Sequence, residues 1–392
     1  MAKQVSKPLL SLSGALILAV ASAASGQQYA QPLPVEPQPS VATLPTTYPD
    51  SWIYVQDVFA DSLIDGRVAV IDVSADTAAL KGQVPAAYFA NVLPATKTPN
   101  IYVAETFYSR GSRGTRTDAI TVWDRATLRP TGEILLPGEK RGLFASVKDA
   151  FQFTNDEKWA LVYNFTPASS VTVVDLENRR VLSEIGVPGC SLAYPTGERG
   201  FMSLCADGTM TSVHLASDGK LAGTNTSKAF NDIDRDPMFM IPAMVGSTAW
   251  FVTFQGNLQG IDLSGPDAHL VSSFATPREK TTEGEWRPGG LQVLTSDRLG
   301  RLYVLMNPAG KEGSHKAGGS EIWVLDPAKK ARIARYPLKN LAFSIEATKQ
   351  SQPLLVASRL DGSLDIYDAA SGTFRRTIAN AVHDASVMLA AQ

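Results

Sequence analysis

The sequence has few charged side chains and no excess of either sign. Lysine and arginine number 36 against 38 aspartates and glutamates, and charged residues make up 19% of the 392 positions. Because nucleic-acid backbones require a basic surface, this balance argues against a nucleic-acid partner. Hydrophobic residues make up 44%, enough for a core, which excludes a long disordered chain. The 30 glycines and 24 prolines indicate many turns and exclude a coiled coil.

Histidines and catalytic signatures are also scarce. The four histidines are His214, His269, His315 and His383, and none has a metal-binding spacing, so we expect no metal in this chain. The sequence has no nucleophile elbow, no phosphate-binding loop and no dinucleotide fingerprint. Carboxylates that converge at one end of the fold would escape such a search, and this alternative stays open. The residues alone favour a binding scaffold over a self-contained enzyme.

The only long apolar run lies at the N-terminus. Lys3 and Lys7 flank the start of the apolar stretch Leu9–Val20, and small residues follow it. This order is typical of a secretory signal peptide, which we place at residues 1–26. An uncleaved membrane anchor is the alternative, but the run is shorter than the roughly 20 residues that span a bilayer. Residues 27–50 contain six prolines and are expected to form a Pro/Gln-rich flexible arm. We expect no membrane span after cleavage.

Two cysteines, Cys190 and Cys205, are present, too few for a disulfide-dense miniprotein. They flank the turn-forming segment Pro195–Gly200, so the two thiols are expected to face each other on paired strands. In an exported protein such an even pair predicts a disulfide. A catalytic or metal-bound thiol is the alternative, but no cysteine or histidine motif accompanies either residue.

A short strand-like pattern that ends in Asp recurs along the rest of the chain. Apolar residues alternate before the final residue, as in Val68–Asp72 and Ile120–Asp124. Seven copies occur at a mean spacing of about 49 residues, and one of them ends in His. Their last residues are Asp72, Asp124, Asp175, His214, Asp262, Asp326 and Asp368. Each Asp is expected to accept hydrogen bonds from the turn that follows.

This repeat predicts an all-β fold, a seven-bladed β-propeller of four-stranded blades over residues 51–392. One blade cannot bury both faces of its sheet, whereas blades stacked around an axis can. A two-sheet sandwich or two β domains is the alternative, and seven evenly spaced units argue against it. Residues 276–290 and 307–320 lengthen one repeat, and such long loops are where binding surface is expected.

Several segments are recognisable together: Arg113–Asp118 leading into Ile120–Asp124, then Trp286–Gly290, Asn307–Lys316 and Glu321–Asp326. With the cysteine pair, they resemble the heavy chain of the tryptophan tryptophylquinone amine dehydrogenases, from about Trp52 to the end of the chain. The run Gly310–Lys316 is more similar to aromatic amine (aralkylamine) dehydrogenase than to methylamine dehydrogenase.

The resemblance implies the heavy, non-cofactor subunit of a periplasmic amine dehydrogenase. Two heavy and two light chains would form a heterotetramer, with tryptophan tryptophylquinone on the light chain and no cofactor or catalytic residue in this chain. Primary, here aromatic, amines would be oxidatively deaminated to aldehyde and ammonia, with electrons passed to a small copper protein of the azurin or amicyanin type. The alternatives are a stand-alone periplasmic propeller binding protein and a lactonase-like propeller hydrolase.

The resemblance also assigns site residues. In the family an aromatic residue ahead of the second blade lines the substrate channel, and here Tyr88 or Phe89 matches it, although the chain departs from the family's Gly-Gly-Phe pattern. Ordinary packing is the alternative for both. The candidates for the partner interface are Arg113, Arg116, Trp286, Arg287, His315 and Lys316. The alternatives are a solvated pair for Arg113 and Arg116, a core residue for Trp286, and a surface loop without a role for His315 and Lys316.

Overall fold

The computed structural model of the chain describes residues 42–58, 62–144, 147–384 and 387–391. The expected signal peptide, residues 1–26, and the arm as far as residue 41 lie outside the described residues. Residues 43–392 form one compact unit, and everything that follows concerns this unit.

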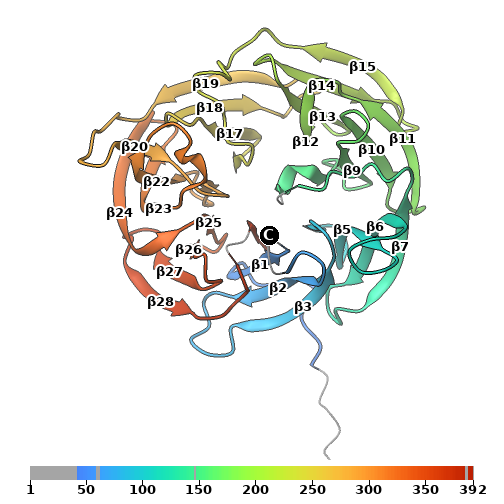
Figure 1. Ribbon diagram of the computed structural model, residues 1–392, viewed down its shortest axis with the longest axis horizontal. Helices are drawn as coiled ribbons and strands as arrows, with labels where there is room; N and C mark the ends of the chain where they lie inside the picture. Colours follow the sequence, from blue (N-terminus) through green and yellow to red (C-terminus); the bar gives the residue numbers. More distant parts are fainter. Residues whose placement is uncertain (1–41, 59–61, 145–146, 385–386, 392) are drawn as a thin grey trace, which may run out of the picture. The chain divides into compact units, whose positions relative to one another are not determined.

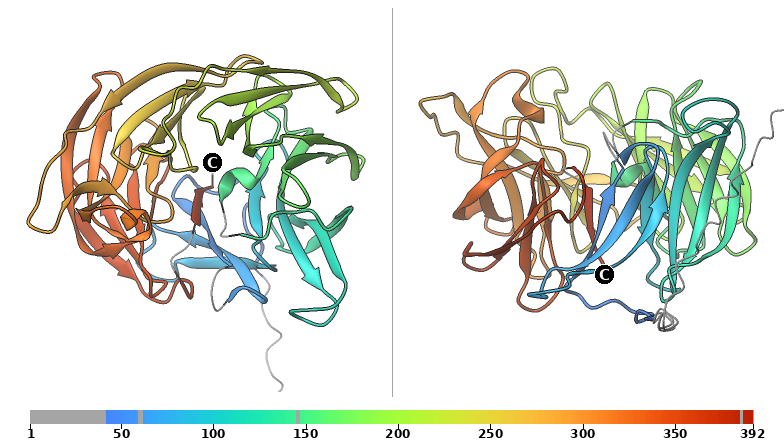
Figure 2. Two further views of the ribbon diagram at one scale, coloured as in Figure 1. Left: turned by 45° about the horizontal axis from the view of Figure 1, so that its top comes forward. Right: turned by 60° about the horizontal axis from the view of Figure 1, so that its bottom comes forward.

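Seven antiparallel sheets surround a central axis (Figure 1). The chain passes once around the ring, and the last strand of each sheet lies on the rim. The tilted views of Figure 2 show that the sheets pack face to face around the axis. The prediction of an all-β, seven-bladed propeller is therefore confirmed.

The strands of each sheet are named here from the axis outward. The first sheet contains β29 (Val387–Ala390), β1 (Trp52–Asp57), β2 (Gly66–Asp72) and β3 (Leu80–Ala86), and the second contains β4 (Asn91–Pro94), β5 (Asn100–Tyr108), β6 (Arg116–Asp124) and β7 (Pro130–Leu136). The third contains β8 (Phe151–Phe153), β9 (Trp159–Asn164), β10 (Ser170–Asp175) and β11 (Arg180–Gly186), and the fourth contains β12 (Cys190–Thr196), β13 (Gly200–Cys205), β14 (Met210–Leu215) and β15 (Leu221–Thr226). The fifth contains β16 (Ala243–Val245), β17 (Thr248–Val252), β18 (Asn257–Asp262) and β19 (His269–Ala275). The sixth contains β20 (Glu285–Pro288) and β21 (Leu294–Ser296), then β22 (Leu302–Gly310), β23 (Gly319–Asp326) and β24 (Ala331–Ala342). The seventh contains β25 (Ser344–Ala347), β26 (Leu354–Ser358), β27 (Leu364–Asp368) and β28 (Phe374–Ile378).

The two ends of the described chain meet in the first sheet. Strand β29 pairs with β1, in a register that runs from Ile53 opposite Ala390 to Gln56 opposite Val387. The C-terminal strand thus supplies the innermost position of the sheet that the N-terminal strand begins. This pairing closes the ring, because the two ends of the described chain are joined within one sheet.

The innermost strand of the sixth sheet is interrupted, so this sheet has five strands while the other six have four. Strands β20 and β21 pair with successive parts of β22. The break follows Pro288, where Gly290 adopts a φ of +142°, a conformation that side chains other than glycine rarely reach. A Cβ at Gly289 would stand 2.5 Å from the carbonyl oxygen of Ala317.

The recurring Asp residues end the third strand of their sheets, as the sequence predicts. Asp72 accepts the backbone N–H of Ser74 at 3.0 Å, and Asp124 accepts that of Thr127 at 2.8 Å. Asp368 accepts the N–H groups of Ala370 and Ser371 at 3.0 and 3.1 Å. These carboxylates therefore cap turns within their own blades.

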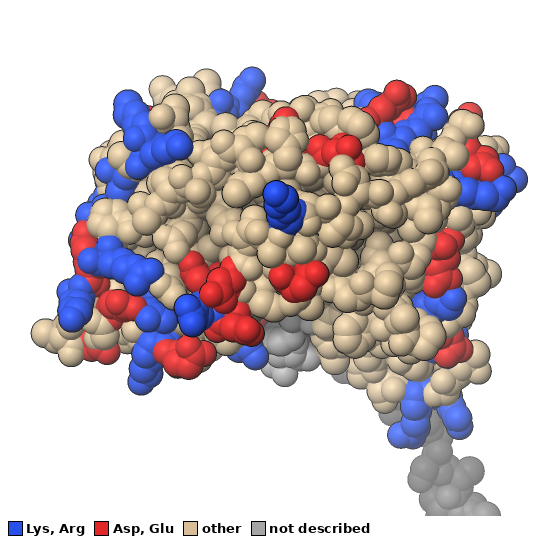
Figure 3. Space-filling model, turned by 90° about the horizontal axis from the view of Figure 1, so that it is seen from above, with Lys and Arg blue, Asp and Glu red and all other residues tan. Residues whose placement is uncertain are grey.

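Neighbouring sheets bury each other's faces, which explains the continuous apolar runs of the inner strands. Strands β1, β9 and β10 are buried at every position, as expected of strands covered on both sides. The rim is more open, and Figure 3 shows a broad area with few charged side chains on the side of the ring that carries β15 and β19. Its exposed apolar side chains include Leu221, Leu270 and Val271.

The antiparallel order gives the ring two different faces. One face carries two kinds of connection. The first kind runs from the outermost strand of one sheet to the innermost strand of the next, and the second kind joins the second and third strands of the same sheet. We call this the site face, because all eight candidate channel and interface residues lie on it. The opposite turn face carries the Asp-capped turns. Among the described residues no helix is long and apolar enough to cross a bilayer, and the two short 3-10 helices are η2 (Lys148–Ala150) and η3 (Ser314–Lys316).

Candidate functional site

Tyr88 and Phe89 lie in the short connection from β3 to β4, on the site face. Both side chains are half-buried, and the Tyr88 ring meets the edge of Tyr108 at a centroid distance of 5.1 Å. Their φ angles are 21° and 50°, so two successive non-glycine residues occupy left-handed backbone. Such conformations cost about 1–3 kcal/mol each and persist where the surroundings hold them in place.

Arg141, a buried residue in the connection from β7 to β8, holds the backbone of Tyr88 and Phe89 in place. Its guanidinium donates to the carbonyl oxygen of Phe89 at 2.9 Å and to that of Tyr88. The same group donates to the hydroxyl of Thr106 on β5, at 2.9 and 3.1 Å. Burial lowers the pKa of Arg141 to about 10, so the group remains charged at neutral pH. One cation thus fixes the backbone of both aromatic residues.

Asp118 on β6 completes this cluster. Its carboxylate receives two hydrogen bonds from Arg116, at 2.9 and 2.8 Å, and one from the backbone N–H of Arg141 at 3.1 Å. It also accepts the Thr106 hydroxyl at 2.6 Å. Arg116 in turn donates to the carbonyl oxygen of Arg141 at 2.7 Å. Arg116, a candidate for the partner interface, is therefore paired within its own chain and linked to the candidate channel residues.

A second buried carboxylate fixes the start of the same connection. Glu105 on β5 accepts the N–H of Ala87 at 2.8 Å and the hydroxyl of Thr121 at 2.5 Å. Burial raises the pKa of Glu105. The connection that carries the aromatic pair is thus held at its start by Glu105 on β5 and further along by Arg141.

Four other interface candidates, Trp286, Arg287, His315 and Lys316, belong to the sixth sheet. The guanidinium of Arg287 lies 4.9 Å from the ring centre of Phe254, and the imidazole of His315 meets the same ring edge-on at 6.0 Å. Arg287 also pairs with Glu285 through its Nε at 2.6 Å. Lys316 adjoins this cluster and is exposed. The structure therefore brings Arg287 of β20 and His315 of the connection from β22 to β23 to the same ring.

Trp286 is half-buried between the inner strand and the outer part of the sixth sheet. Its ring lies 5.9 Å from that of Trp323, and the guanidinium of Arg335 lies 5.1 and 5.3 Å from the two ring centres. Arg335 in turn pairs with Glu321 and Glu279, both at 2.6 Å. Arg113 lies far from this group, exposed in the connection from β5 to β6. No contact joins the two groups of candidates among the described residues.

The predicted disulfide between Cys190 and Cys205 is confirmed. The two residues are direct partners in the pairing of β12 with β13, as the turn between them implies. The disulfide lines a cavity of about 390 Å³ on the site face, whose described walls carry no charged side chain. Phe165 overhangs it with 63% of its surface exposed, and packs edge-on against Phe144. This apolar surface is suited to receive part of another chain.

Polar groups also meet near the axis. Lys148 of the third sheet pairs with Glu346 of the seventh at 2.7 Å, beside a cavity of about 350 Å³. Asp149 is buried, and burial raises its pKa to about 7. No group of three or more His, Cys, Asp or Glu residues suited to a metal ion occurs among the residues that the structure describes. Asp149 and Glu346 thus both line this cavity, and Glu346 is paired there with Lys148.

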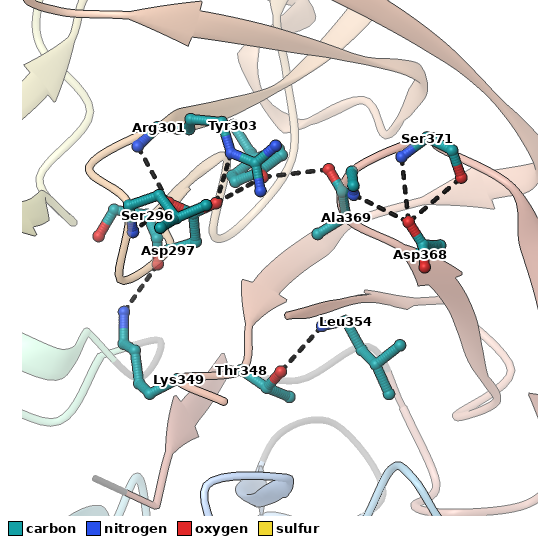
Figure 4. A network of polar contacts seen from close by, with 12 residues as sticks. Ser296, Asp297, Arg301, Tyr303, Thr348, Lys349, Leu354, Asp368, Ala369 and Ser371 are labelled. Atoms are coloured by element: carbon teal, nitrogen blue, oxygen red, sulfur yellow. Dashed lines mark hydrogen bonds and ion pairs between the residues drawn. The ribbon is translucent and has the colours of Figure 1, made fainter. Parts of the chain in front are cut away.

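The turn face is held by contacts of a different kind (Figure 4). Asp297 accepts Arg301 Nε at 2.6 Å and the Tyr303 hydroxyl at 2.8 Å, and Tyr303 also donates to the carbonyl oxygen of Ala369 at 3.2 Å. Lys349 donates to the carbonyl oxygen of Ser296 at 2.7 Å. The bonds from Tyr303 to Ala369 and from Lys349 to Ser296 join the sixth and seventh sheets.

Sequence reasoning missed Arg141, Asp118 and Glu105 as functional residues. Asp118 ends the segment Arg113–Asp118, which the resemblance singled out, but nothing in the sequence shows what it binds. Arg141 falls in an irregular connection and belongs to no repeat. Its signal is positional only: a cation between two glycines, Gly138 and Gly142, ahead of a strand.

Comparisons with known proteins agree with this architecture. A sequence profile described as methylamine dehydrogenase heavy chain (MADH) matches residues 51–392. The methylamine dehydrogenase heavy chain of Paracoccus versutus is 32% identical over 336 residues, 83% of this chain and 76% of that protein. The corresponding protein of Methylorubrum extorquens is 28% identical over 303 residues, 76% of this chain and 73% of that protein.

Two solved structures resemble the fold. A functionally unknown protein from Desulfotomaculum acetoxidans superimposes with a TM-score of 0.58 at 14% identity, covering 86% of this chain and 98% of that one. The dihydro-heme d1 dehydrogenase NirN gives a TM-score of 0.51 at 14% identity, covering 92% and 78%. At this identity the likeness extends to the fold alone.

Proposed function

Because the chain belongs to the methylamine dehydrogenase heavy-chain family, we propose that it is the heavy subunit of a quinone-dependent amine dehydrogenase that oxidises primary aromatic amines to aldehyde and ammonia. The match to the family over residues 51–392, the whole propeller, carries this proposal. The preference for aromatic amines is supported by the resemblance of Gly310–Lys316 to aromatic amine dehydrogenase. It is also supported by the two adjacent aromatic side chains at Tyr88 and Phe89.

The cofactor is proposed to lie on a separate light chain, as tryptophan tryptophylquinone, in an assembly of two heavy and two light chains. When bound, this quinone supplies the electrophilic carbonyl and accepts the two electrons of amine oxidation. Trp286 and Trp323 are the one pair of adjacent tryptophans among the described residues, and Trp323 is fully buried. Arg332 and Arg335 lie against the Trp323 ring, as expected of a packing residue.

The residues of this chain would act by shaping the site. Tyr88 and Phe89 would form one wall of the substrate channel where the light chain meets the site face. The uncharged cavity beside Phe165 and the cluster of Arg287, His315 and Lys316 would contact the partner. Covering the site in this way excludes water, and a less polar surrounding strengthens the electrostatic interactions that stabilise developing charge.

The proposed location is the periplasm, reached by the signal peptide at residues 1–26. The proposed electron acceptor is a small copper protein of the azurin or amicyanin type. Both follow from the family resemblance and the N-terminal sequence.

Size and composition analysis of the native complex, isolated through an affinity tag on this chain, tests the proposal. We expect a coloured complex with a smaller, cysteine-rich chain, whose visible absorbance changes when phenylethylamine or tyramine is added, and less readily with methylamine. A colourless chain isolated without a partner would favour a stand-alone binding protein. Lactone hydrolysis by the isolated chain with added calcium would favour the lactonase-like alternative.

A further inference from the structure

We propose that Arg141 is a positioning residue that fixes how far Tyr88 and Phe89 project at the site face, and so sets which amines pass them. The inference rests on the proposed function, because it assigns amine selectivity to a wall of the proposed channel. It adds a residue from a different connection, one that makes no contact with the amine itself.

The backbone of the aromatic pair supports this inference. Two successive residues at φ 21° and 50° would relax to ordinary backbone if nothing held them, since such strain persists only where the surroundings over-determine it. The holding contacts identified here are the bonds from Arg141 to the two carbonyl oxygens and the bond from Ala87 to Glu105. Strained backbone held by a buried cation is a feature that clusters at functional sites.

The position of Arg141 is set by rigid strands. Its backbone N–H is fixed by Asp118 on β6 and its guanidinium by Thr106 on β5, and these two residues are direct partners across the second sheet. The aromatic pair is thus placed by the framework of the second sheet. Sites supported in this way hold their geometry more tightly than sites that depend on a loop alone.

The fork of donors on arginine is essential to the arrangement. A guanidinium donates in one plane to two carbonyl oxygens and a hydroxyl, whereas a lysine ammonium is a point charge on a flexible stem. Arg141→Lys therefore keeps the positive charge and loses the simultaneous bonds to Tyr88 and Phe89. The connection should then relax and change the width of the channel wall.

The test is Arg141→Lys in the complete heavy and light chain complex, with kcat and KM measured for phenylethylamine, tyramine and methylamine. We expect the ratio of kcat/KM for phenylethylamine over methylamine to change by about tenfold, the scale on which pocket size discriminates substrates. The change should lie mainly in KM, with kcat for methylamine nearly unaltered. Hydrogen exchange of the segment 87–91 in the same complex should become faster, which provides a readout independent of turnover.

Arg125→Lys is the matched control. Like Arg141, Arg125 is buried in the second sheet and donates to backbone carbonyl oxygens, those of Thr46 at 3.2 Å and of Ala95. Unlike Arg141, it lies on the turn face. This variant should lose stability, yet leave the amine ratio and the exchange of segment 87–91 as in the wild type. A purely structural role for Arg141 would make the two variants behave alike.

Thr106→Val covers the case in which Arg141→Lys does not assemble. It removes the hydroxyl that orients the guanidinium and should shift the amine ratio in the same direction by a smaller factor. An active wild-type complex with an unchanged ratio in the variant that assembles would overturn the role of Arg141 and leave the proposed function intact. A wild-type complex that oxidises no amine would overturn the proposed function itself, and the inference with it.

Discussion

The two faces of the ring are built from contacts of different range. On the turn face the recurring Asp residues bind groups close to them in sequence, as Asp368 binds the N–H groups of Ala370 and Ser371. On the site face Arg141 reaches Thr106, Tyr88 and Phe89, which lie 35 to 53 residues away. The Asp-capped turns thus form within single blades, whereas the Arg141 cluster of the site face depends on contacts between connections that lie far apart in the sequence.

This difference has an energetic consequence. The Asp368 carboxylate, which caps a turn of the turn face, is partly open to water, so solvent can replace a lost partner. Asp118 has 1% of its side chain exposed and lies between two guanidinium-bearing residues. Buried ionic groups left without a partner cost far more than exposed ones, so the Asp118 cluster should be more sensitive to single substitutions than the capped turn at Asp368.

Asp118→Ala should have the largest effect on stability. The change leaves the Arg116 guanidinium without its carboxylate partner and removes the acceptor for the Arg141 N–H. Breaking a buried pair from one side costs about 3–5 kcal/mol. Urea unfolding of the heavy chain measures this loss, and a loss below about 1 kcal/mol would place Asp118 in the same class as the exposed pairs of the turn face.

Asp149→Asn should change how stability depends on pH. The carboxyl pKa is about 7 in the folded protein and near its ordinary value of about 3.9 in the unfolded chain. Between these values the folded form keeps a proton that the unfolded form has released, so wild-type stability falls as pH rises, by up to about 1.4 kcal/mol per pH unit. Asparagine does not titrate. The free energy of unfolding of the variant should therefore rise relative to that of the wild type from pH 4 to 7, and the difference should stay constant above pH 7.

Asp207→Asn is the control with the opposite sign. Hydrogen bonds from Thr209 lower the pKa of this exposed carboxyl, so its contribution to stability is present above the unfolded pKa and is lost as pH falls. Unfolding midpoints at pH 4, 5.5, 7 and 8 distinguish the two. Parallel pH profiles for the wild type and Asp149→Asn would show that Asp149 ionises freely.

Replacing both Cys190 and Cys205 by serine should lower the free energy of unfolding by about 3 kcal/mol, the value expected for closing a loop of this size. The quinone spectrum of the assembled complex should stay unchanged, because the disulfide supports β12 and β13 and makes no contact with Tyr88 or Phe89. A reducing agent should lower wild-type stability to that of the variant and leave the variant unaffected. If the variant and the oxidised wild type had equal free energies of unfolding, the disulfide would not stabilise the fold.

The same difference in range explains what the sequence reveals. The repeat that ends at Asp72, Asp124 and Asp368, and the pairing of Cys190 with Cys205, depend on neighbours within one blade, and both were predictable. The interrupted inner strand of the sixth sheet was not, since it depends on how Gly289 approaches a connection almost 30 residues away.

The candidate site was only partly predictable for a similar reason. Tyr88, Phe89 and Arg116 were identified by family resemblance, and the structure links them to one another. Arg141 was not identified, because a buried ionic residue in an irregular segment has no periodicity to reveal it. Its partners are known only once the second sheet is folded and the connections from two blades are brought together.

Asp368→Ala should have the smallest effect and completes the comparison of the two faces. Its carboxylate caps a turn within the seventh blade and pairs with Arg375 at 2.7 Å, and hydrogen bonds from this arginine and the turn lower its pKa. Water can reach these groups after the substitution, so the expected loss is about 1 kcal/mol, measured by the same urea unfolding as for Asp118→Ala. The loss should shrink as pH falls through the lowered pKa of Asp368, because protonation weakens the same bonds in the wild type. A loss as large as that of Asp118→Ala would mean that capped turns, and not only contacts between blades, hold the ring together.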